Sequence, residues 1–229
     1  QIVHSDQSGK SVFATTYQGQ TVSSPVEDGV KYTEFLPSLN VSIEFADDAF
    51  LRVGAARMLA RPRMDQLNPG GGISFDVAKR ANTDINASPW SGTVGNARLR
   101  PLMAETLDIS VEKYFGRGAY ISAGGFYKYL ENWIYRQSEL YDFTGTEVPD
   151  GGTTATYLGV VSQWKNGNGG RIYGLEASLS LPFATFASGL DGFGVLASGS
   201  YTKSKVREGG AAAIPMPGLS TWVVNSTAY

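Results

Sequence analysis

The stretch Ser38-Leu39-Asn40-Val41-Ser42-Ile43-Glu44-Phe45 alternates strictly between polar and apolar residues. Such a period of two predicts a β-strand with one apolar face and one polar face. Asp47 and Asp48 predict a tight turn, and residues 49–59 predict a returning strand whose apolar face continues the first. The alternation fails at Arg57, which indicates either a bulge or the point where the strand leaves an apolar environment.

The same pattern recurs along the chain and predicts an all-β fold. Further strands are expected at residues 106–115, 120–136, 171–181 and 192–206, with a seventh from about residue 219. The turns after the first and third strands are short, and that at residues 183–191 is somewhat longer. The connections at residues 61–103 and 137–169 are long and rich in Gly, Asn, Asp, Ser and Thr.

The two rims of the predicted sheet therefore differ, and the strand ends are aromatic, as at Phe45, Phe115, Tyr127, Trp133 and Tyr135. Short turns on one rim, long loops on the other and aromatic girdles are typical of an antiparallel up-and-down transmembrane β-barrel. Alternation alone would also fit a soluble β-sandwich. The test between them is whether the apolar faces share one convex surface or pack against each other.

The composition excludes several classes of protein. The 229 residues include no Cys and one His, His4, which excludes disulfide scaffolds, thiolate zinc sites and His-rich metal cages. The formal net charge is −2, so no basic excess favours nucleic acid. We expect no cofactor and no metal. The chain starts at Gln1 without a signal peptide and ends inside a predicted strand, so we expect a piece of a larger protein.

Four segments in order resemble the barrel of TonB-dependent outer-membrane receptors, with the closest similarity to the Xanthomonas–Caulobacter-type subgroup. They are Phe35-Leu36-Pro37-Ser38-Leu39-Asn40, Gly95-Asn96-Ala97-Arg98-Leu99-Arg100-Pro101, Gly170-Arg171-Ile172-Tyr173-Gly174-Leu175-Glu176 and Pro217-Gly218-Leu219-Ser220. Ala97 and Arg100 replace the Pro and Lys that are usual in the second motif. A passive porin or autotransporter barrel would share the strands but lacks this order of motifs.

The resemblance implies a barrel of about 22 strands in the bacterial outer membrane, filled by an N-terminal plug. Import would be driven by the TonB complex of the inner membrane, through an N-terminal region that this chain does not include. The chain would supply about seven strands. Residues 1–35 would form an extracellular loop segment and residues 36–229 a partial barrel. The expected partners are outer-membrane lipid and a small-molecule or oligosaccharide ligand, and no enzymatic activity is expected.

Three groups of candidate site residues follow. Four charged residues lie on the predicted polar face, and we expect them to face the lumen: Arg52, Asp108, Glu112 and Glu176. Carboxylate pairs also occur in glycosidases, but a water-filled lumen explains the presence of charged residues here. The outer-rim arginines are Arg61, Arg63, Arg98 and Arg100, which would bind an anionic ligand, lipopolysaccharide or the plug. Trp90 and Trp164 lie in the long loops, where indole rings can stack on sugars or pack the loops.

The function predicted first is uptake of an oligosaccharide. A ferric-siderophore receptor is the alternative within the same family, and it would rely on the four arginines. A soluble, secreted all-β carbohydrate-binding or adhesion domain is the alternative outside it.

Overall fold

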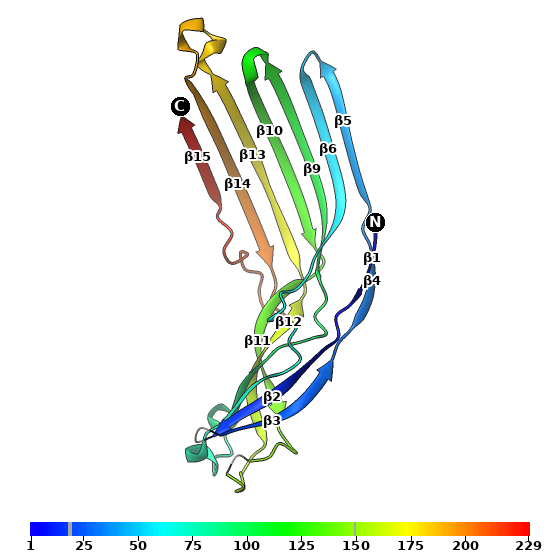
Figure 1. Cartoon of the computed structure of the whole chain (residues 1–229), viewed down its shortest axis with the longest axis vertical. Coiled ribbons are helices and arrows are strands. Elements are labelled where there is room, and N and C mark those ends of the chain that lie inside the picture. Colours follow the sequence, from blue (N-terminus) through cyan, green and yellow to red (C-terminus); the bar gives the residue numbers. More distant parts are fainter. Residues whose placement is uncertain (18–19, 149) are drawn as a thin grey trace.

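The computed structural model describes residues 1–17, 20–148 and 150–229, and its largest element is an antiparallel sheet of seven strands, the main sheet (Figure 1). Its order is β15-β14-β13-β10-β9-β6-β5. Each strand therefore pairs with the next strand of this sheet along the chain, and the strand numbers that are missing between β5 and β15 belong to the long connections. The strands are β5 (Ser38–Ala46), β6 (Ala49–Ala60), β9 (Leu102–Phe115), β10 (Ala119–Leu130), β13 (Gly170–Pro182), β14 (Gly194–Val206) and β15 (Trp222–Ala228).

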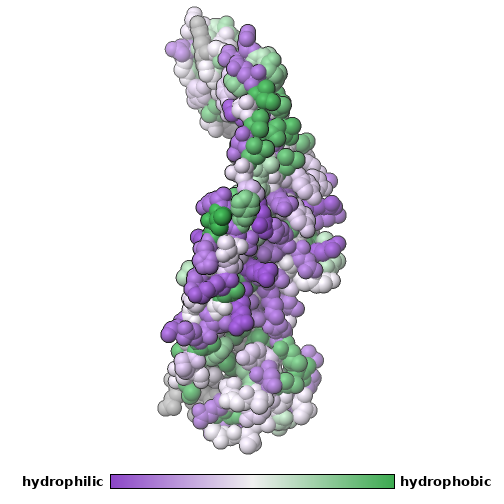
Figure 2. All heavy atoms as spheres, turned by 90° about the vertical axis from the view of Figure 1, so that its right-hand side faces the viewer, coloured by the Kyte–Doolittle hydropathy of each residue, from purple (hydrophilic) through white to green (hydrophobic). Residues whose placement is uncertain are grey.

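The main sheet carries the predicted alternation as continuous rows across its strands. Val41, Val53, Ile109, Gly125 and Leu175 are direct partners in one row of the apolar face. This face is open, with Ile109 51% and Leu175 65% exposed. Figure 2, which views the molecule from the β5 edge, shows hydrophobic residues gathered along one side of the upper part. Because no second sheet of the described residues packs against this face, the sandwich alternative is excluded and the open barrel fragment is confirmed.

The long connections fold into a second sheet of six strands, the loop sheet, beyond one rim of the main sheet (Figure 1). Its order is β11 (Trp133–Asp142), β12 (Leu158–Gly167), β8 (Trp90–Val94), β7 (Gly71–Phe75), β2 (Gly9–Tyr17) and β3 (Gln20–Asp28). A core of Ile73, Phe75, Trp90, Phe143 and Val161, with other apolar residues, packs against it. The predicted loops 61–103 and 137–169 therefore contribute strands to this sheet: β7 and β8 from the first, and most of β11 and all of β12 from the second.

Two smaller elements complete this region. β1 (Ile2–Asp6) pairs with β4 (Lys31–Phe35), and β4 continues through Leu36 and Pro37 into β5. The predicted segments 1–35 and 137–169 each include residues outside the described ranges.

The predicted strand 120–136 is wrong in one respect, because the chain leaves the main sheet at Glu131 and Asn132. The Asn132 side chain donates to the carbonyl of Pro101 (2.7 Å) and accepts from the amide of Met103 (3.2 Å). These bonds satisfy the backbone of β9 where its ladder with β10 ends, so β11 starts in a new direction. Trp133 and Tyr135 consequently belong to the loop sheet and not to an aromatic girdle.

The failed alternation at Arg57 marks the end of the apolar zone and not a bulge. The pairing of β6 with β9 continues without interruption to Ala60 and Leu102. Arg57 forms ion pairs with Glu131 (2.8 Å) and Glu34 (3.3 Å), which lie beyond the apolar band. The irregular register lies in β5, between Glu44 and Ala46.

The opposite rim of the main sheet carries the short connections, as predicted. β5 and β6 are joined by Asp47 and Asp48, and Asp48 has a φ of 52°, a left-handed conformation that Asp tolerates. Three-residue 3-10 turns join the other pairs: η3 (Gly116–Gly118) follows β9, and η4 (Phe183–Thr185) and η5 (Ser188–Leu190) follow β13. No helix within the described residues is long and apolar enough to cross a membrane.

Candidate functional site

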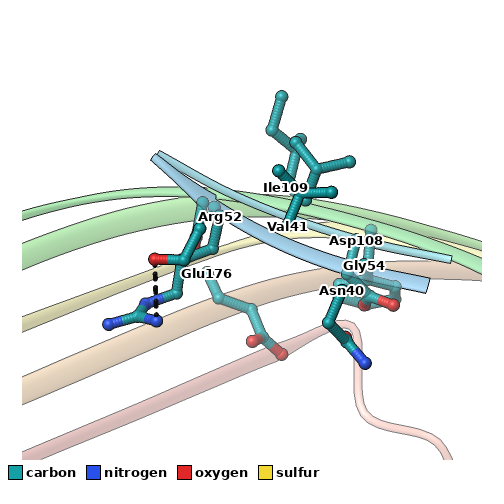
Figure 3. Close-up of a pocket in the computed structure, with 13 residues that line it drawn as sticks. Asn40, Val41, Arg52, Gly54, Asp108, Ile109 and Glu176 are labelled. Atoms are coloured by element: carbon teal, nitrogen blue, oxygen red, sulfur yellow. Dashed lines mark hydrogen bonds between the residues drawn. The ribbon is translucent and has the colours of Figure 1, made fainter. Parts of the chain in front are cut away.

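The concave, polar face of the main sheet brings the predicted lumen-facing residues together. A cavity of about 420 Å³ on this face is lined by Asn40, Ser42, Arg52, Asp108 and Glu176, among others. Val41 and Ile109 point to the opposite side of the sheet (Figure 3). Glu112 lies on the polar face one step along, directly across from Phe50 and Ser122. All four charged residues therefore lie on the polar face of the main sheet.

The charges on this face are only partly balanced. The Arg52 guanidinium contacts Glu112 at 3.0 Å and donates to the Ser42 hydroxyl at 3.2 Å (Figure 3), and the Tyr114 hydroxyl also donates to Glu112 at 2.9 Å. Asp108 and Glu176 have no ion-pair partner among the described residues and are exposed. A glycosidase acid needs a desolvated carboxyl, whereas these two carboxylates are exposed.

The outer-rim arginines are dispersed over the loop region, and carboxylates neutralise two of them. Arg98 contacts Asp28 at 2.8 Å, and its guanidinium holds the pKa of that carboxyl below its usual value. Arg63 forms a bidentate pair with Asp65 and lowers the pKa of that carboxyl in the same way.

The other two arginines are not neutralised by a carboxylate within the described residues. Arg61 reaches the Ser5 hydroxyl, at 3.5 Å. The backbone of Arg100 is held by the Asn166 side chain, while its guanidinium has no ion-pair partner in the part of the chain that the structure describes.

Trp90 is a packing residue, which corrects its predicted contact with a ligand. It is 1% exposed, with ring centroids 4.6 Å from Phe75 and 5.1 Å from Phe143. Its indole nitrogen donates to the carbonyl of Thr156 at 3.0 Å, so the buried donor is satisfied. A ligand would have to displace the loop-sheet core to reach this ring.

Trp164 is half-buried on β12 and keeps part of its surface open. The Arg136 guanidinium lies 5.8 Å from the ring centroid, a cation–π distance. The Trp164 carbonyl accepts from the Asn96 side chain at 3.0 Å. Trp164 therefore remains available to a ligand, unlike Trp90.

Sequence reasoning missed a cavity in the loop region. A volume of about 550 Å³ lies between the β2–β3 hairpin and the segment after β11, and its lining includes Phe13, Ser24, Tyr141, Thr146 and Glu147. No Lys or Arg is among its described lining residues. The hairpin was hidden inside the segment 1–35 that the sequence predicts as loop, although residues 9–17 and 20–28 are rich in β-branched and hydroxyl residues. Among the described residues no cluster of His, Asp and Glu is arranged to hold a metal ion.

The motif Gly95–Pro101 joins the loop sheet to the main sheet. Ala97 and Leu99 are fully buried, and the Asn96 amide donates to the carbonyl of Gln66 at 2.8 Å. A β-carbon at Gly95 would lie 2.0 Å from the carbonyl oxygen of Asn68, so only glycine fits. The motif is thus an ordered connection that ends at the start of β9.

A family model described as "TonB dependent receptor-like, beta-barrel" matches residues 4–229. The chain belongs to this family. Barrels of this family lie in the bacterial outer membrane and are parts of receptors, not of enzymes, as the sequence predicts. A soluble secreted module does not fit this membership.

Solved structures of TonB-dependent-type receptors share the fold. The siderophore receptor PirA from Pseudomonas aeruginosa matches with a TM-score of 0.51 and 20% identity, over 91% of this chain and 33% of that one. A ferric enterobactin receptor from the same organism, PfeA, in complex with enterobactin, matches with a TM-score of 0.57 and 20% identity, over 97% of this chain and 28% of that one. The siderophore receptor PirA from Acinetobacter baumannii matches with a TM-score of 0.54 and 15% identity, over 88% of this chain and 27% of that one. The chain therefore spans about a third or less of these receptors. No curated protein matches it by sequence.

Proposed function

We propose that this chain forms part of the barrel wall and of the extracellular surface of a receptor that imports a neutral, hydroxyl-rich nutrient of the oligosaccharide class. The long-loop rim faces the cell exterior and the short turns face the periplasm. The TonB complex supplies the energy for transport, as the family implies. Residues 1–35 contribute to the extracellular surface through the β2–β3 hairpin.

The observation that carries the choice of ligand is the character of the loop-region cavity. Its lining combines aromatic rings at Phe13 and Tyr141 with hydroxyl groups at Ser24 and Thr146, and Glu147 is its charged member. Apolar walls with a few placed polar groups are typical of small-molecule sites. An anionic chelate would meet a carboxylate and no cation at this place, whereas a sugar offers hydroxyls to the polar groups and an apolar face to the rings.

The arginines support the same choice. Asp65 and Asp28 already neutralise Arg63 and Arg98. Two of the four arginines predicted to bind an anion therefore attract an anionic ligand only weakly. The alternative, a ferric siderophore, agrees with the names of the solved neighbours. Their identity to this chain, 15–20% for the three structures above, supports a common fold only.

The test is uptake by the full-length receptor that contains this segment, with a labelled maltooligosaccharide panel and ferric enterobactin as probes. Tyr141→Ala with Thr146→Ala is expected to lower oligosaccharide uptake at least tenfold, and Trp164→Ala tests the neighbouring aromatic surface. Arg61→Gln with Arg100→Gln should leave it unchanged. Thr202→Ala, which removes a hydroxyl from the main sheet, is the matched control. Uptake of the iron chelate that is lost only in the arginine variant would overturn the proposal.

A further inference from the structure

A row of charged residues crosses the apolar face of the main sheet at its long-loop end. Register places Arg57 opposite Glu105, Glu105 opposite Tyr129, Tyr129 opposite Arg171, and Arg171 opposite Lys205. Each of these five residues lies an even number of positions along its own strand from the row of direct partners that marks the apolar face. Their side chains therefore project from the same face of the sheet, the lipid side. The row marks the upper edge of the apolar band.

The charge of this row is balanced at one end and unbalanced at the other. Arg57 lies opposite Glu105 and also pairs with Glu34 and Glu131. On β13 and β14, Arg171 lies directly opposite another cation, Lys205, and Arg207 follows just beyond. Within the described ranges, none of these three side chains forms an ion pair. Like charges directly opposite each other destabilise a sheet, so an anion that the described residues do not provide would stabilise this end of the row.

The three cations surround a formed cavity. It measures about 380 Å³ and is lined by Tyr127, Tyr129, Arg171, Lys205 and Arg207, together with the turn at residues 168–170 and Ala213. The Arg207 amide donates to the Gly169 carbonyl (3.0 Å), and the Asn168 side chain donates to the Gly209 carbonyl (3.1 Å). These bonds tie the ends of β13 and β14 together and hold the basic side chains at one place.

The position of the cavity indicates the kind of anion. Toward the opposite rim, the next row on the same face holds Leu107, Tyr127, Tyr173 and, at its β14 end, Lys203, with the two tyrosine rings stacked at 6.4 Å. Aliphatic residues follow below them. Tyrosines are typical of the boundary between hydrocarbon and headgroups, so the cavity lies at headgroup level, directly above a surface for acyl chains.

We propose that this cavity binds the phosphate-bearing headgroup of an outer-leaflet glycolipid, whose acyl chains lie along the apolar face below it. Guanidinium groups bind phosphate oxygens with paired hydrogen bonds, and the lysine adds a point charge. The phosphate relieves the repulsion between Arg171 and Lys205. This inference depends on the membrane orientation in the proposed function, but not on the identity of the imported nutrient.

The test uses the full-length receptor in detergent and fluorescent lipid A that carries both phosphates. Arg171→Gln/Lys205→Gln/Arg207→Gln is expected to weaken binding about a hundredfold, at about fivefold for each basic residue near a membrane surface. Arg171→Lys/Arg207→Lys keeps the charge and should retain most of the affinity. Lys10→Gln/Lys79→Gln/Lys128→Gln removes the same charge elsewhere and should bind as the wild type does.

Two ligand arms separate a lipid site from a simple anion site. Dephosphorylated lipid A should bind the wild type as weakly as lipid A binds the triple glutamine variant, and millimolar inorganic phosphate should compete poorly. The proposal is overturned if that variant binds lipid A within threefold of the wild type, if removing the phosphates has no effect, or if free phosphate displaces lipid A completely. Lipid A binding without any oligosaccharide uptake would contradict the proposed nutrient while leaving the lipid site intact.

Discussion

Replacing Ile109 by Arg should destabilise the receptor far more than the same replacement at Ser110. On β9 the apolar band lies between Glu105, at the long-loop end, and Lys113, near the short turns. Eight residues at about 3.4 Å each, tilted by about 40°, give a height of about 21 Å, close to the apolar band of outer-membrane barrels. Ile109 is the midpoint of this band, and we expect Ile109→Arg to cost about 2–4 kcal/mol.

Ser110 is adjacent in sequence but lies on the polar face, in the cavity that also holds Asp108 and Glu176. An arginine there meets water and unpaired carboxylates, so we expect a change within about 0.5 kcal/mol. The assay is guanidinium-induced unfolding of the full-length receptor in phospholipid vesicles. Ile109→Ala serves as the control for lost side-chain volume. Equal costs at the two neighbouring positions would refute the assigned faces of the main sheet.

Three further predictions concern the loop region. Trp90→Ala should cost the loop sheet about 3–5 kcal/mol of stability, because it leaves a cavity in the core beside Phe143. The loss should appear as faster hydrogen exchange in β7 and β8, and unchanged exchange would contradict the core assignment. Asn132→Ala should cost about 1–3 kcal/mol of stability, because it leaves the Met103 amide and the Pro101 carbonyl without their side-chain partner. Hydrogen exchange where β10 gives way to β11 should become faster, and equal protection in the variant would show that Asn132 does not cause the chain to leave the main sheet there. Hydrogen bonds from Lys31 and from the hydroxyl and backbone amide of Ser8 lower the pKa of Asp6 from 3.8 to about 2, so their contribution to stability is present above pH 3.8 and is lost as the pH falls toward 2. Asp6→Asn should abolish that pH dependence in NMR titrations of the β1–β4 pair, and its persistence would exclude Asp6 as the cause.

The main sheet was predictable from sequence because its pattern is local. Each residue of a membrane-facing strand alternates between lipid and lumen, so Ser38–Phe45 and residues 106–115 show their faces without knowledge of their partners. The sequence left a bulge and the end of the apolar zone as alternatives at Arg57, because an ion pair with Glu131, 74 residues away, cannot be read from the alternation of one strand.

The loop sheet was not predictable in the same way. β7 and β8 have five residues each, and β7 begins with two glycines. Parallel pairing of β2 with β7 joins Phe13 to Gly71, a contact that only the folded chain reveals. Trp90 and Trp164 are similar in sequence context, yet one is in a core and the other is half-open. Likewise, the opposition of Arg171 and Lys205 depends on register, which no motif encodes.

Membrane topology underlies both proposals and can be measured directly. The chain contains no cysteine, so single cysteines can be introduced at Glu147, in the loop region, and at Asp48, in the turn between β5 and β6, in a full-length receptor otherwise free of reactive thiols. A membrane-impermeant maleimide added to intact cells should label Glu147→Cys at once, and Asp48→Cys only after the outer membrane is permeabilised. Labelling of Asp48→Cys on intact cells, with Glu147→Cys protected, would contradict the orientation from which both the ligand surface and the lipid site are inferred.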